Sequence, residues 1–255
     1  MSIGRFIYST ISSKDKVEHY QQIIRDAEWE NIANHIPKNS KFLDVGCGAG
    51  YSLMRASQDL NCEVEGIDAD PGSHGVGRFI KDMVKTVPIK KGFAENLTYE
   101  NESFDVVYSS HVLEHVNDES KALDEMRRVL KKDGVLIIGM PTASMAILNY
   151  ISQLTFTTHI KIYEFFRNAF FKNALNNFIK IFRINSHSYP RARSIWYDLF
   201  HYRISNWEKT IKREFKVKTV IKPCFYPYPD YPQFFKLHKS KLFSSSVFFI
   251  CKKQP

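Results

Sequence analysis

The chain has 255 residues, of which 44% are hydrophobic and 25% are charged, and its formal net charge at pH 7 is +9. This length allows an ample core, and the four cysteines lie too far apart, without C-x-x-C spacing, for a disulfide framework or a cysteine-based metal site. No apolar run reaches the roughly 18 residues of a membrane span or resembles a signal peptide, so we expect a cytoplasmic protein.

The charge is divided unevenly along the chain. Residues 1–140 contain 17 Lys and Arg and 22 Asp and Glu, a net charge of −5, whereas residues 141–255 contain 19 and 5, a net charge of +14. The second part also holds 25 of the Phe, Tyr and Trp residues, against 11 in the first. This division favours a cofactor-binding part followed by a part that faces an anionic or amphipathic acceptor. A basic surface that serves solubility alone is the alternative.

Apolar residues spaced by three and four predict a helix over residues 14–36, which Pro37 ends. The stretch Lys41–Gly50 then predicts an apolar strand that runs straight into a glycine loop. The loop has glycines at three alternate positions, Gly46, Gly48 and Gly50. Glycine permits positive φ and lacks the Cβ atom that would keep a ligand from the backbone. A helix expected over residues 51–60 adds free N–H groups that suit a carboxylate, a phosphate or ribose oxygens, so we expect a ligand on this loop.

Strands and short helices continue to alternate up to residue 140. Further strands are predicted over residues 62–68, 87–93, 103–110 and 135–140, and a helix is predicted over residues 119–130, ended by Asp133-Gly134. This alternation is typical of an α/β fold with a doubly wound, mostly parallel sheet, whose ligands lie beyond the carboxyl ends of the strands. Four segments fall at such ends and are expected to converge on one crevice: Asp44–Gly50, Asp68, Ala94–Glu95 and Ser109–His111.

The glycine spacing and the next acidic residue restrict the ligand. A dinucleotide fingerprint has the spacing G-x-G-x-x-G, but here Tyr51 stands at the place of the third glycine, so NAD is disfavoured. No Gly-Lys-Ser/Thr follows, which excludes a Walker loop. Asp68 ends its strand, where a carboxylate reaches the two hydroxyls of a ribose on the neighbouring loop. A surface aspartate in a turn before Pro71 is the alternative.

The pattern after Thr142 changes to helical, basic and aromatic. Residues 159–182 carry Phe, Tyr and Ile on one side and Lys and Asn on the other, which is typical of an amphipathic helix in a membrane interface or of a helix that covers the active site as a lid. A helix over residues 204–215 and strands over residues 215–221 and 246–251 follow, and these two strands can pair antiparallel at the edge of the sheet. We therefore expect an N-terminal helical cap, an α/β core, a helical insertion before the last two strands and a C-terminal part, with the bounds 1–37, 38–142, 143–203 and 204–255.

Five motifs in unbroken order, over about residues 38–142, carry a family resemblance. They are Leu43–Gly50, Gly66-Ile-Asp68, Ala94-Glu-Asn-Leu97, Phe104–Asp118 and Met126–Gly134. Together they resemble the class I S-adenosylmethionine-dependent methyltransferases of the small-molecule, type 11-like kind. The resemblance implies S-adenosylmethionine as the cofactor and a Rossmann-like, seven-stranded sheet with the last strand antiparallel.

The resemblance also implies roles for single residues. Asp44 and the loop residues Gly46, Cys47, Gly48 and Gly50 would hold the methionine end of the cofactor, and Asp68 would hold the ribose. Ala69 would flank the adenine, Ala94 would offer its backbone N–H to the adenine edge, and Ser109 would lie where the fourth strand meets the sulfonium. Phe93 stands where many relatives have an aspartate that binds the adenine amino group, so Glu95 or stacking by the Phe93 ring would replace that contact.

The acceptor side is less well defined. His111 is the first candidate for a general base because it directly follows the fourth strand and an imidazole titrates near neutrality. His115 is a weaker candidate with a structural alternative, and Glu114 is expected to be a solvated or helix-capping carboxylate. Catalysis by proximity alone, without a base, is the alternative. Farther along, His187, Tyr189 and Arg193 (with Arg191) form a polar cluster that meets an anionic acceptor or lies in a solvated loop.

We therefore expect methyl transfer. The preferred acceptor is an oxygen of a glycan or lipid-linked molecule at the cytoplasmic membrane face. A soluble metabolite or a quinone precursor is the alternative acceptor, and a non-catalytic S-adenosylmethionine-binding protein is the alternative class. No nucleic-acid partner is expected, because no amino-methylating Asn-Pro-Pro-Tyr motif or RNA-binding module is present. Peripheral membrane contact is expected through residues 159–182.

Overall fold

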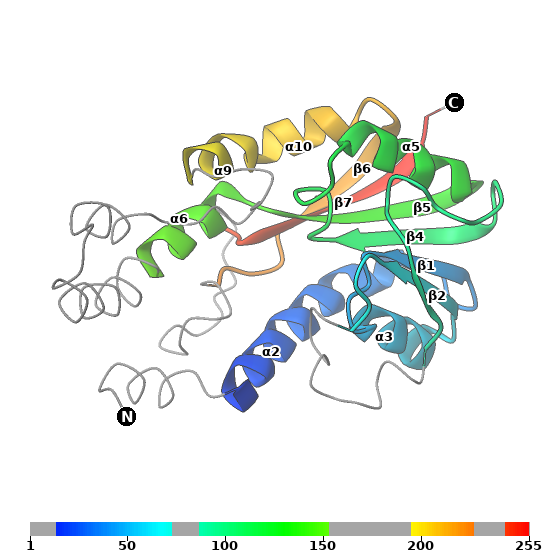
Figure 1. The fold of residues 1–255 in the computed structure, drawn as a ribbon, viewed down its shortest axis with the longest axis horizontal. Coiled ribbons are helices and arrows are strands. Elements are labelled where there is room, and N and C mark those ends of the chain that lie inside the picture. Colours follow the sequence, from blue (N-terminus) through cyan, green and yellow to red (C-terminus); the bar gives the residue numbers. More distant parts are fainter. Residues whose placement is uncertain (1–13, 73–86, 153–194, 227–242, 255) are drawn as a thin grey trace, which may run out of the picture.

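The computed structural model describes residues 14–72, 87–152, 195–226 and 243–254. Seven strands lie within these ranges: β1 (Lys41–Val45), β2 (Glu63–Asp68), β3 (Ile89–Lys91), β4 (Phe104–Ser110), β5 (Leu130–Pro141), β6 (Phe215–Ile221) and β7 (Ser246–Lys253). They form one sheet in the order β3-β2-β1-β4-β5-β7-β6 (Figure 1). β7 runs antiparallel to both of its neighbours, and the other pairings are parallel. The predicted doubly wound sheet with an antiparallel last strand is confirmed.

The order of the strands defines a crevice at the carboxyl end of the sheet. β1 pairs in parallel with β2 on one side and with β4 on the other, so the chain leaves β1 in one direction and later returns to its opposite edge. The carboxyl ends of β1 and β4 therefore flank a topological switch point, the place where open α/β sheets bind their ligands. The residues directly after these two strands are the glycine loop and His111.

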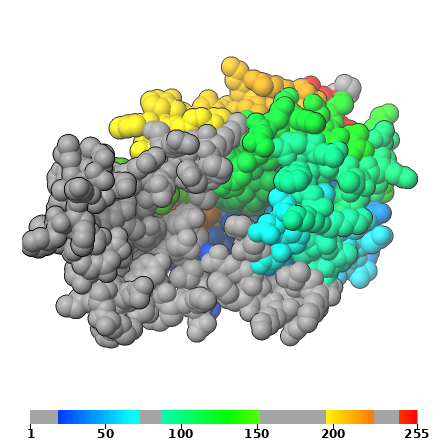
Figure 2. Space-filling view, in the orientation of Figure 1, coloured from blue at the N-terminus to red at the C-terminus, as the bar shows by residue number. Residues whose placement is uncertain are grey.

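Helices cover both faces of the sheet (Figure 1). One face is covered by α2 (Lys14–Ile32), which continues into a 3₁₀ turn, and by α3 (Tyr51–Leu60). The other face is covered by α5 (Glu119–Val129) and α10 (Ile204–Ile211), while α6 (Ala143–Ser152) and α9 (Ile195–His201) contact each other near the end of β5. In the space-filling view, α9 and α10 form the upper rim of the face that is turned to the reader (Figure 2).

The two layers have separate apolar cores because alternate strand residues point to opposite faces. Phe42 packs with Trp29 and Leu53 on the side of α2 and α3, whereas Leu43 packs with Met126 and other residues on the side of α5 and α10. All five of these side chains are buried. Burial on both faces explains why β1 reads as a nearly continuous apolar run.

The predicted helix over residues 119–130 is confirmed to within one residue, but the prediction that Asp133-Gly134 is its stop is wrong. α5 ends at Val129, and Leu130 already has extended backbone angles and is fully buried. Asp133-Gly134 lies instead within an irregular part of β5, where the pairing with β4 shifts between Phe104 and Val106. A Cβ atom at Gly134 would lie 2.6 Å from a Leu130 methyl carbon, so close packing rather than a helix stop accounts for this glycine. The predicted helix over residues 204–215 likewise ends earlier, at Ile211, and Phe215 begins β6.

Candidate active site

The glycine loop after β1 has the predicted backbone. Gly46, Gly48 and Gly50 have φ angles of 80°, 53° and 88°. The loop is tied to β2, because the Gly46 and Cys47 N–H groups both donate to the Ile67 carbonyl oxygen, at 2.7 and 3.2 Å. Neighbouring side chains occupy the space that a Cβ atom would need at two of these glycines. A Cβ atom at Gly46 would lie 2.2 Å from Val112, and one at Gly50 would lie 2.8 Å from Val87. These two glycines thus serve packing as well as conformation.

Asp68 lies against this loop, as its position at the end of β2 predicts. Its Oδ2 atom accepts a hydrogen bond from the Gly48 N–H at 2.7 Å, and its Oδ1 atom accepts one from the Asp70 N–H at 2.8 Å. The second contact is that of an aspartate in a turn, but the first joins the carboxylate to the glycine loop. Each carboxylate oxygen keeps acceptor capacity for a further donor, such as a ribose hydroxyl.

Asp44 is buried beneath the loop, with 1% of its surface exposed. The Ser52 hydroxyl donates to its Oδ2 atom. Burial raises the pKa of Asp44 to about 7; the hydrogen bond from Ser52 opposes the rise, and the neighbouring Asp68 carboxylate adds to it. Asp44 can therefore hold a proton near neutrality, and a cationic group placed beside it would favour release of that proton.

The start of α3 supplies backbone donors to the same place. Its N-cap is Gly50, in the left-handed region and without a side-chain cap. The first N–H groups of a helix lack partners within the helix and attract anionic groups, so this end suits a carboxylate. Cys47 adds no nucleophile, since burial and the Asp44 and Asp68 carboxylates raise its thiol pKa above the usual range.

The residues expected at the adenine differ in their surroundings. Ala69 is exposed and Ala94 is buried. Phe93 is 62% exposed, an unusual environment for a large apolar ring. The Glu95 Oε1 atom accepts a hydrogen bond from the Asn117 N–H at 3.0 Å. This arrangement favours the Phe93 ring over Glu95 as the group that replaces the missing aspartate.

Two residues at the end of β4 close the crevice. Ser109 is buried, and its hydroxyl donates to the Val45 carbonyl oxygen at 3.0 Å, so it joins the carboxyl ends of β1 and β4. His111 has a φ angle of +58°, and its backbone N–H donates to the Gly139 carbonyl oxygen on β5 at 2.9 Å. The side chain of His111 is 11% exposed.

The expectation that Glu114 is solvated or caps a helix is wrong. The chain turns after His111, with the His115 N–H donating to the Val112 carbonyl oxygen at 2.8 Å, and Glu114 points inward with no exposed surface. Its Oε1 atom lies 3.4 Å from His111 Nδ1 and 4.0 Å from His115 Nε2. The His115 side chain is 41% exposed, in keeping with its secondary place.

The sequence reasoning missed a buried polar network beside His111. Glu28 on α2 is 1% exposed and forms an ion pair with Arg25. Its Oε1 atom accepts hydrogen bonds from the Tyr226 hydroxyl, at 2.9 Å, and from the Ser246 hydroxyl. Burial alone would raise the pKa of Glu28, but Arg25, the charge of protonated His111 and the two hydroxyls together lower it. In the sequence the only signal was an i, i+3 charge pair on a helix.

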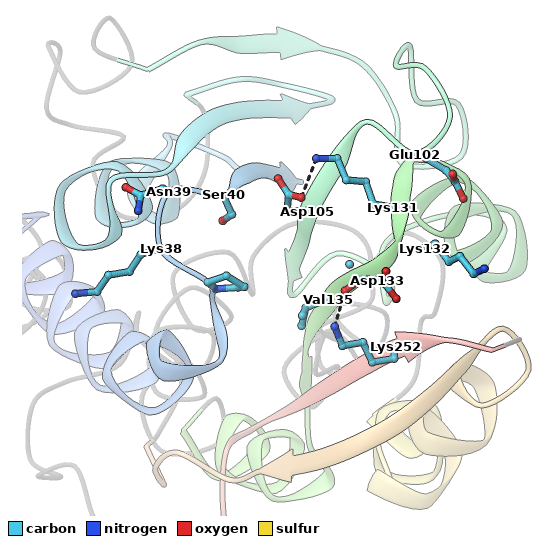
Figure 3. Close-up of a pocket in the computed structure, with 12 residues that line it drawn as sticks. Lys38, Asn39, Ser40, Glu102, Asp105, Lys131, Lys132, Asp133, Val135 and Lys252 are labelled. Carbon is cyan, nitrogen blue, oxygen red and sulfur yellow. Dashed lines mark hydrogen bonds and ion pairs between the residues drawn. The ribbon is translucent and has the colours of Figure 1, made fainter.

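A cavity of about 710 Å³ lies at the opposite end of the strands (Figure 3). It is lined by residues that precede β1, that lie around the starts of β4 and β5, and by Lys252 of β7. Two of its lysines have partners within it: Lys131 pairs with Asp105 at 2.8 Å, and Lys252 donates to the Asp133 backbone carbonyl oxygen at 2.6 Å. Ligands of doubly wound sheets bind at the carboxyl ends, where the glycine loop and His111 lie. We therefore place the candidate site there and not in this cavity.

Several predicted residues fall outside the described part of the chain. These are His187, Tyr189 and Arg193, the candidates for contact with the acceptor, and residues 159–182, the predicted amphipathic segment. Within the described ranges, no helix combines the length and the apolar character that a membrane span requires.

Residues 43–138 match the family model of the methyltransferase domain. The chain is 28% identical over 137 residues to a ubiquinone/menaquinone biosynthesis C-methyltransferase of Campylobacter jejuni, a match over 49% of this chain and 57% of that protein. It is 30% identical over 123 residues to a ubiquinone biosynthesis O-methyltransferase of Pelagibacter ubique, over 48% of this chain and 50% of that protein. The chain thus spans about half the length of these curated relatives.

Solved structures share the fold over nearly the whole chain. A Thermotoga maritima protein described as a possible histamine N-methyltransferase has a TM-score of 0.56, with 18% identity and 98% of each chain covered. An S-adenosylmethionine-dependent methyltransferase of Mesorhizobium loti has a TM-score of 0.51, with 14% identity, 89% of this chain and 97% of that chain covered. At these identities the likeness shows the fold.

Proposed function

We propose that this chain, whose residues 43–138 form a class I S-adenosylmethionine-dependent methyltransferase domain, transfers a methyl group from that cofactor to a small-molecule acceptor. One observation carries the proposal most strongly. The Asp68 carboxylate is hydrogen-bonded to the Gly48 N–H of a glycine loop with three positive φ angles, beside the switch point of the sheet. A carboxylate and free backbone donors at this place suit a nucleoside that carries an amino-acid tail.

The described residues fit the parts of this cofactor. Asp68 would accept from the ribose hydroxyls, and the exposed Phe93 ring would stack on the adenine. The first N–H groups of α3 would receive the cofactor's carboxylate, and the buried Asp44 would favour its ammonium group. When bound, the cofactor supplies a methyl group activated on a sulfonium, and a hydroxyl acceptor that takes it must lose its proton.

His111 would receive that proton. It lies at the carboxyl end of β4, on the other side of the switch point from the glycine loop, and its Nδ1 atom lies 3.4 Å from the buried Glu114 carboxylate. Base catalysis contributes about 100-fold to 10,000-fold where it operates. His111→Ala should therefore lower turnover by about that factor and leave cofactor affinity nearly unchanged, and unchanged turnover would remove His111 from the mechanism.

The acceptor class is the finer part of the proposal. The two curated relatives named above are named for ubiquinone and menaquinone biosynthesis, one as a C-methyltransferase and the other as an O-methyltransferase, which favours a quinone precursor as the acceptor. The basic, aromatic composition after residue 140 favours an oxygen of an anionic glycan or lipid-linked acceptor. Peripheral membrane contact through residues 159–182 is part of the second proposal, because a lipid-linked acceptor lies at the membrane.

Labelled cofactor distinguishes these acceptors. The protein is incubated with methyl-labelled S-adenosylmethionine and with fractionated extract, separated into quinone precursors, lipid-linked glycans and soluble metabolites. Label in one fraction, absent with His111→Ala, identifies the acceptor class. Binding of the cofactor with no label in any fraction would favour the non-catalytic alternative, and failure to bind the cofactor would overturn the proposal as a whole.

A separate experiment tests the membrane contact. The double variant Lys172→Glu/Lys180→Glu should sediment less with anionic liposomes than the wild type does. Equal, salt-independent sedimentation of the two proteins would count against the contact.

A further inference from the structure

Two neighbouring helices expose apolar side chains. On α6, Ile147 and Ile151 lie four residues apart and therefore on one face of the helix, and on α9 the same spacing relates Trp196 and Phe200. These four side chains are 48–67% exposed, and Tyr150 of α6 is exposed as well. Because α6 and α9 contact each other, we call these five residues together the α6–α9 face.

Polar side chains of the same two helices point inward. Asn149 on α6 and Asp198 on α9 are both buried. A helix that faces water usually has its polar side chains outside and its apolar ones toward the core, whereas here these polar side chains are buried while the α6–α9 face is exposed. A single exposed apolar residue is normal, but five on two neighbouring helices indicate a surface that meets an apolar partner.

The α6–α9 face lies at the end of the sheet that carries the candidate site. α6 begins at Ala143, directly after β5 ends at Pro141, and β5 runs parallel to β4, whose carboxyl end flanks the switch point. Figure 1 shows both helices at the left, beyond the arrowhead of β4. A partner bound to this face therefore lies on the same side of the molecule as the crevice.

The charge around the face favours an anionic partner. No acidic side chain is exposed in residues 143–152 and 195–203, whereas Arg203 is exposed, with its guanidinium carbon 4.8 Å from the centre of the Phe200 ring. Residues 141–255 as a whole have a net charge of +14. A second copy of this chain would bring two such basic parts together, which is unfavourable, whereas anionic lipid headgroups attract them. Trp and Tyr rings are also typical of the membrane–water interface.

We infer that the α6–α9 face, together with Arg203, binds the surface of an anionic lipid bilayer. The Trp196 and Phe200 rings would insert among the headgroups, and the Arg203 guanidinium would pair with lipid phosphate. This contact uses residues outside the segment 159–182 and does not depend on it. Its consequence for the reaction rests on the proposed function: an acceptor held at the bilayer would approach the crevice from this side.

Tryptophan fluorescence of the wild-type protein tests the contact without any variant that must first be shown to fold. Of the three tryptophans, Trp29 and Trp207 are buried, so Trp196 is the exposed reporter. Vesicles of phosphatidylcholine mixed with phosphatidylglycerol should shift its emission to shorter wavelengths, and brominated acyl chains in these vesicles should quench it. Trp196→Phe should remove both signals. Unchanged emission of the wild type at saturating lipid would overturn the inference.

Sedimentation with the same vesicles measures the contribution of each group. Trp196→Ala/Phe200→Ala should weaken binding about 10-fold to 100-fold, and Arg203→Gln should weaken it about 5-fold at low salt and less at high salt. Ile147→Ala should also weaken binding, whereas the matched control Ile23→Ala, at an exposed isoleucine of α2, should not. Equal binding of the wild type and the double variant would overturn the inference. A wild-type dimer that the double variant dissociates, without vesicle binding by either protein, would also overturn it.

Cofactor titration on the same samples separates this contact from the proposed function. Trp196→Ala/Phe200→Ala should bind S-adenosylmethionine as the wild type does, because the residues placed on the cofactor side lie outside α6 and α9. Vesicle binding without cofactor binding by the wild type would refute the proposed function and leave the membrane contact in place. Cofactor binding without vesicle binding would refute only the membrane contact.

Discussion

The two sides of the candidate site are built in different ways. The cofactor side is made mainly by the stretch from β1 to the end of β2, with Phe93 after β3 at the adenine, and the contacts of that stretch are mostly local and mostly to backbone groups, as in the Gly48–Asp68 hydrogen bond. The acceptor side is assembled from residues far apart in the chain, since Glu28 accepts hydrogen bonds from residues 198 and 218 positions away. The first side depends on backbone conformation, and the second depends on buried charge and on the docking of α2.

Removal of Glu28 should have the largest effect on stability and little effect on cofactor affinity. Glu28→Ala leaves Arg25, whose side chain is 30% exposed, without its partner and removes the acceptor for Tyr226 and Ser246. We expect a loss of about 2–4 kcal/mol in the free energy of unfolding, measured by urea denaturation. Glu30→Ala, exposed on the same helix, is the control. A loss no larger than that of Glu30→Ala would show that this network does not hold α2 to the core.

Gly46→Ala should damage the cofactor side in both stability and affinity. The new Cβ atom would lie 2.2 Å from Val112, at a φ angle of 80° that alanine rarely adopts. We expect about 2–3 kcal/mol of destabilisation, measured by denaturation, and weaker cofactor binding, measured by calorimetry. In the double variant with Val112→Ala the steric part should be recovered and the conformational part should remain. Full recovery would mean that the positive φ angle contributes nothing.

Asp68→Asn should separate affinity from stability on the cofactor side. The amide keeps an oxygen for the Gly48 N–H but loses the charge and one acceptor, so we expect cofactor affinity to fall about 10-fold to 100-fold, equivalent to about 1.4–2.7 kcal/mol. The thermal midpoint should change little. Asp70→Asn, on an exposed neighbour, is the matched control in the same calorimetric titration. Equal affinities of both variants and the wild type would remove Asp68 from the cofactor site.

Asp44→Asn should give the smallest change of the four variants. It should raise the free energy of unfolding, whereas Glu28→Ala and Gly46→Ala should lower it. Because the folded-state pKa of Asp44 is raised to about 7, folding becomes less favourable as the pH rises from the unfolded pKa near 4 up to about 7. The neutral amide avoids this cost, so the variant should be more stable than the wild type by about 1–2 kcal/mol at pH 8 and about equally stable at pH 4. Denaturation curves at the two pH values measure this, and a pH-independent difference would contradict the raised pKa.

Local features could be predicted from the sequence, whereas contacts between residues far apart in the chain could not. The bounds of β1 and α3 were predicted correctly because a buried apolar run and three glycines act locally. The place of Asp133-Gly134 was predicted wrongly because this pair has the chemistry of a helix stop but lies in an irregular part of β5. The burial of Glu114 could not be predicted, since a side chain in a single turn follows no periodicity. Glu28 was missed because its partners come from the other end of the chain.

Calorimetric titration of the wild-type protein with S-adenosylmethionine tests the central claim most directly. The geometry of the glycine loop, Asp68 and Asp44 predicts saturable binding of one cofactor per chain, with release of a proton when the titration is carried out near pH 6, because the cofactor's ammonium group favours ionised Asp44. Absence of binding at near-millimolar cofactor would contradict the assignment of this site.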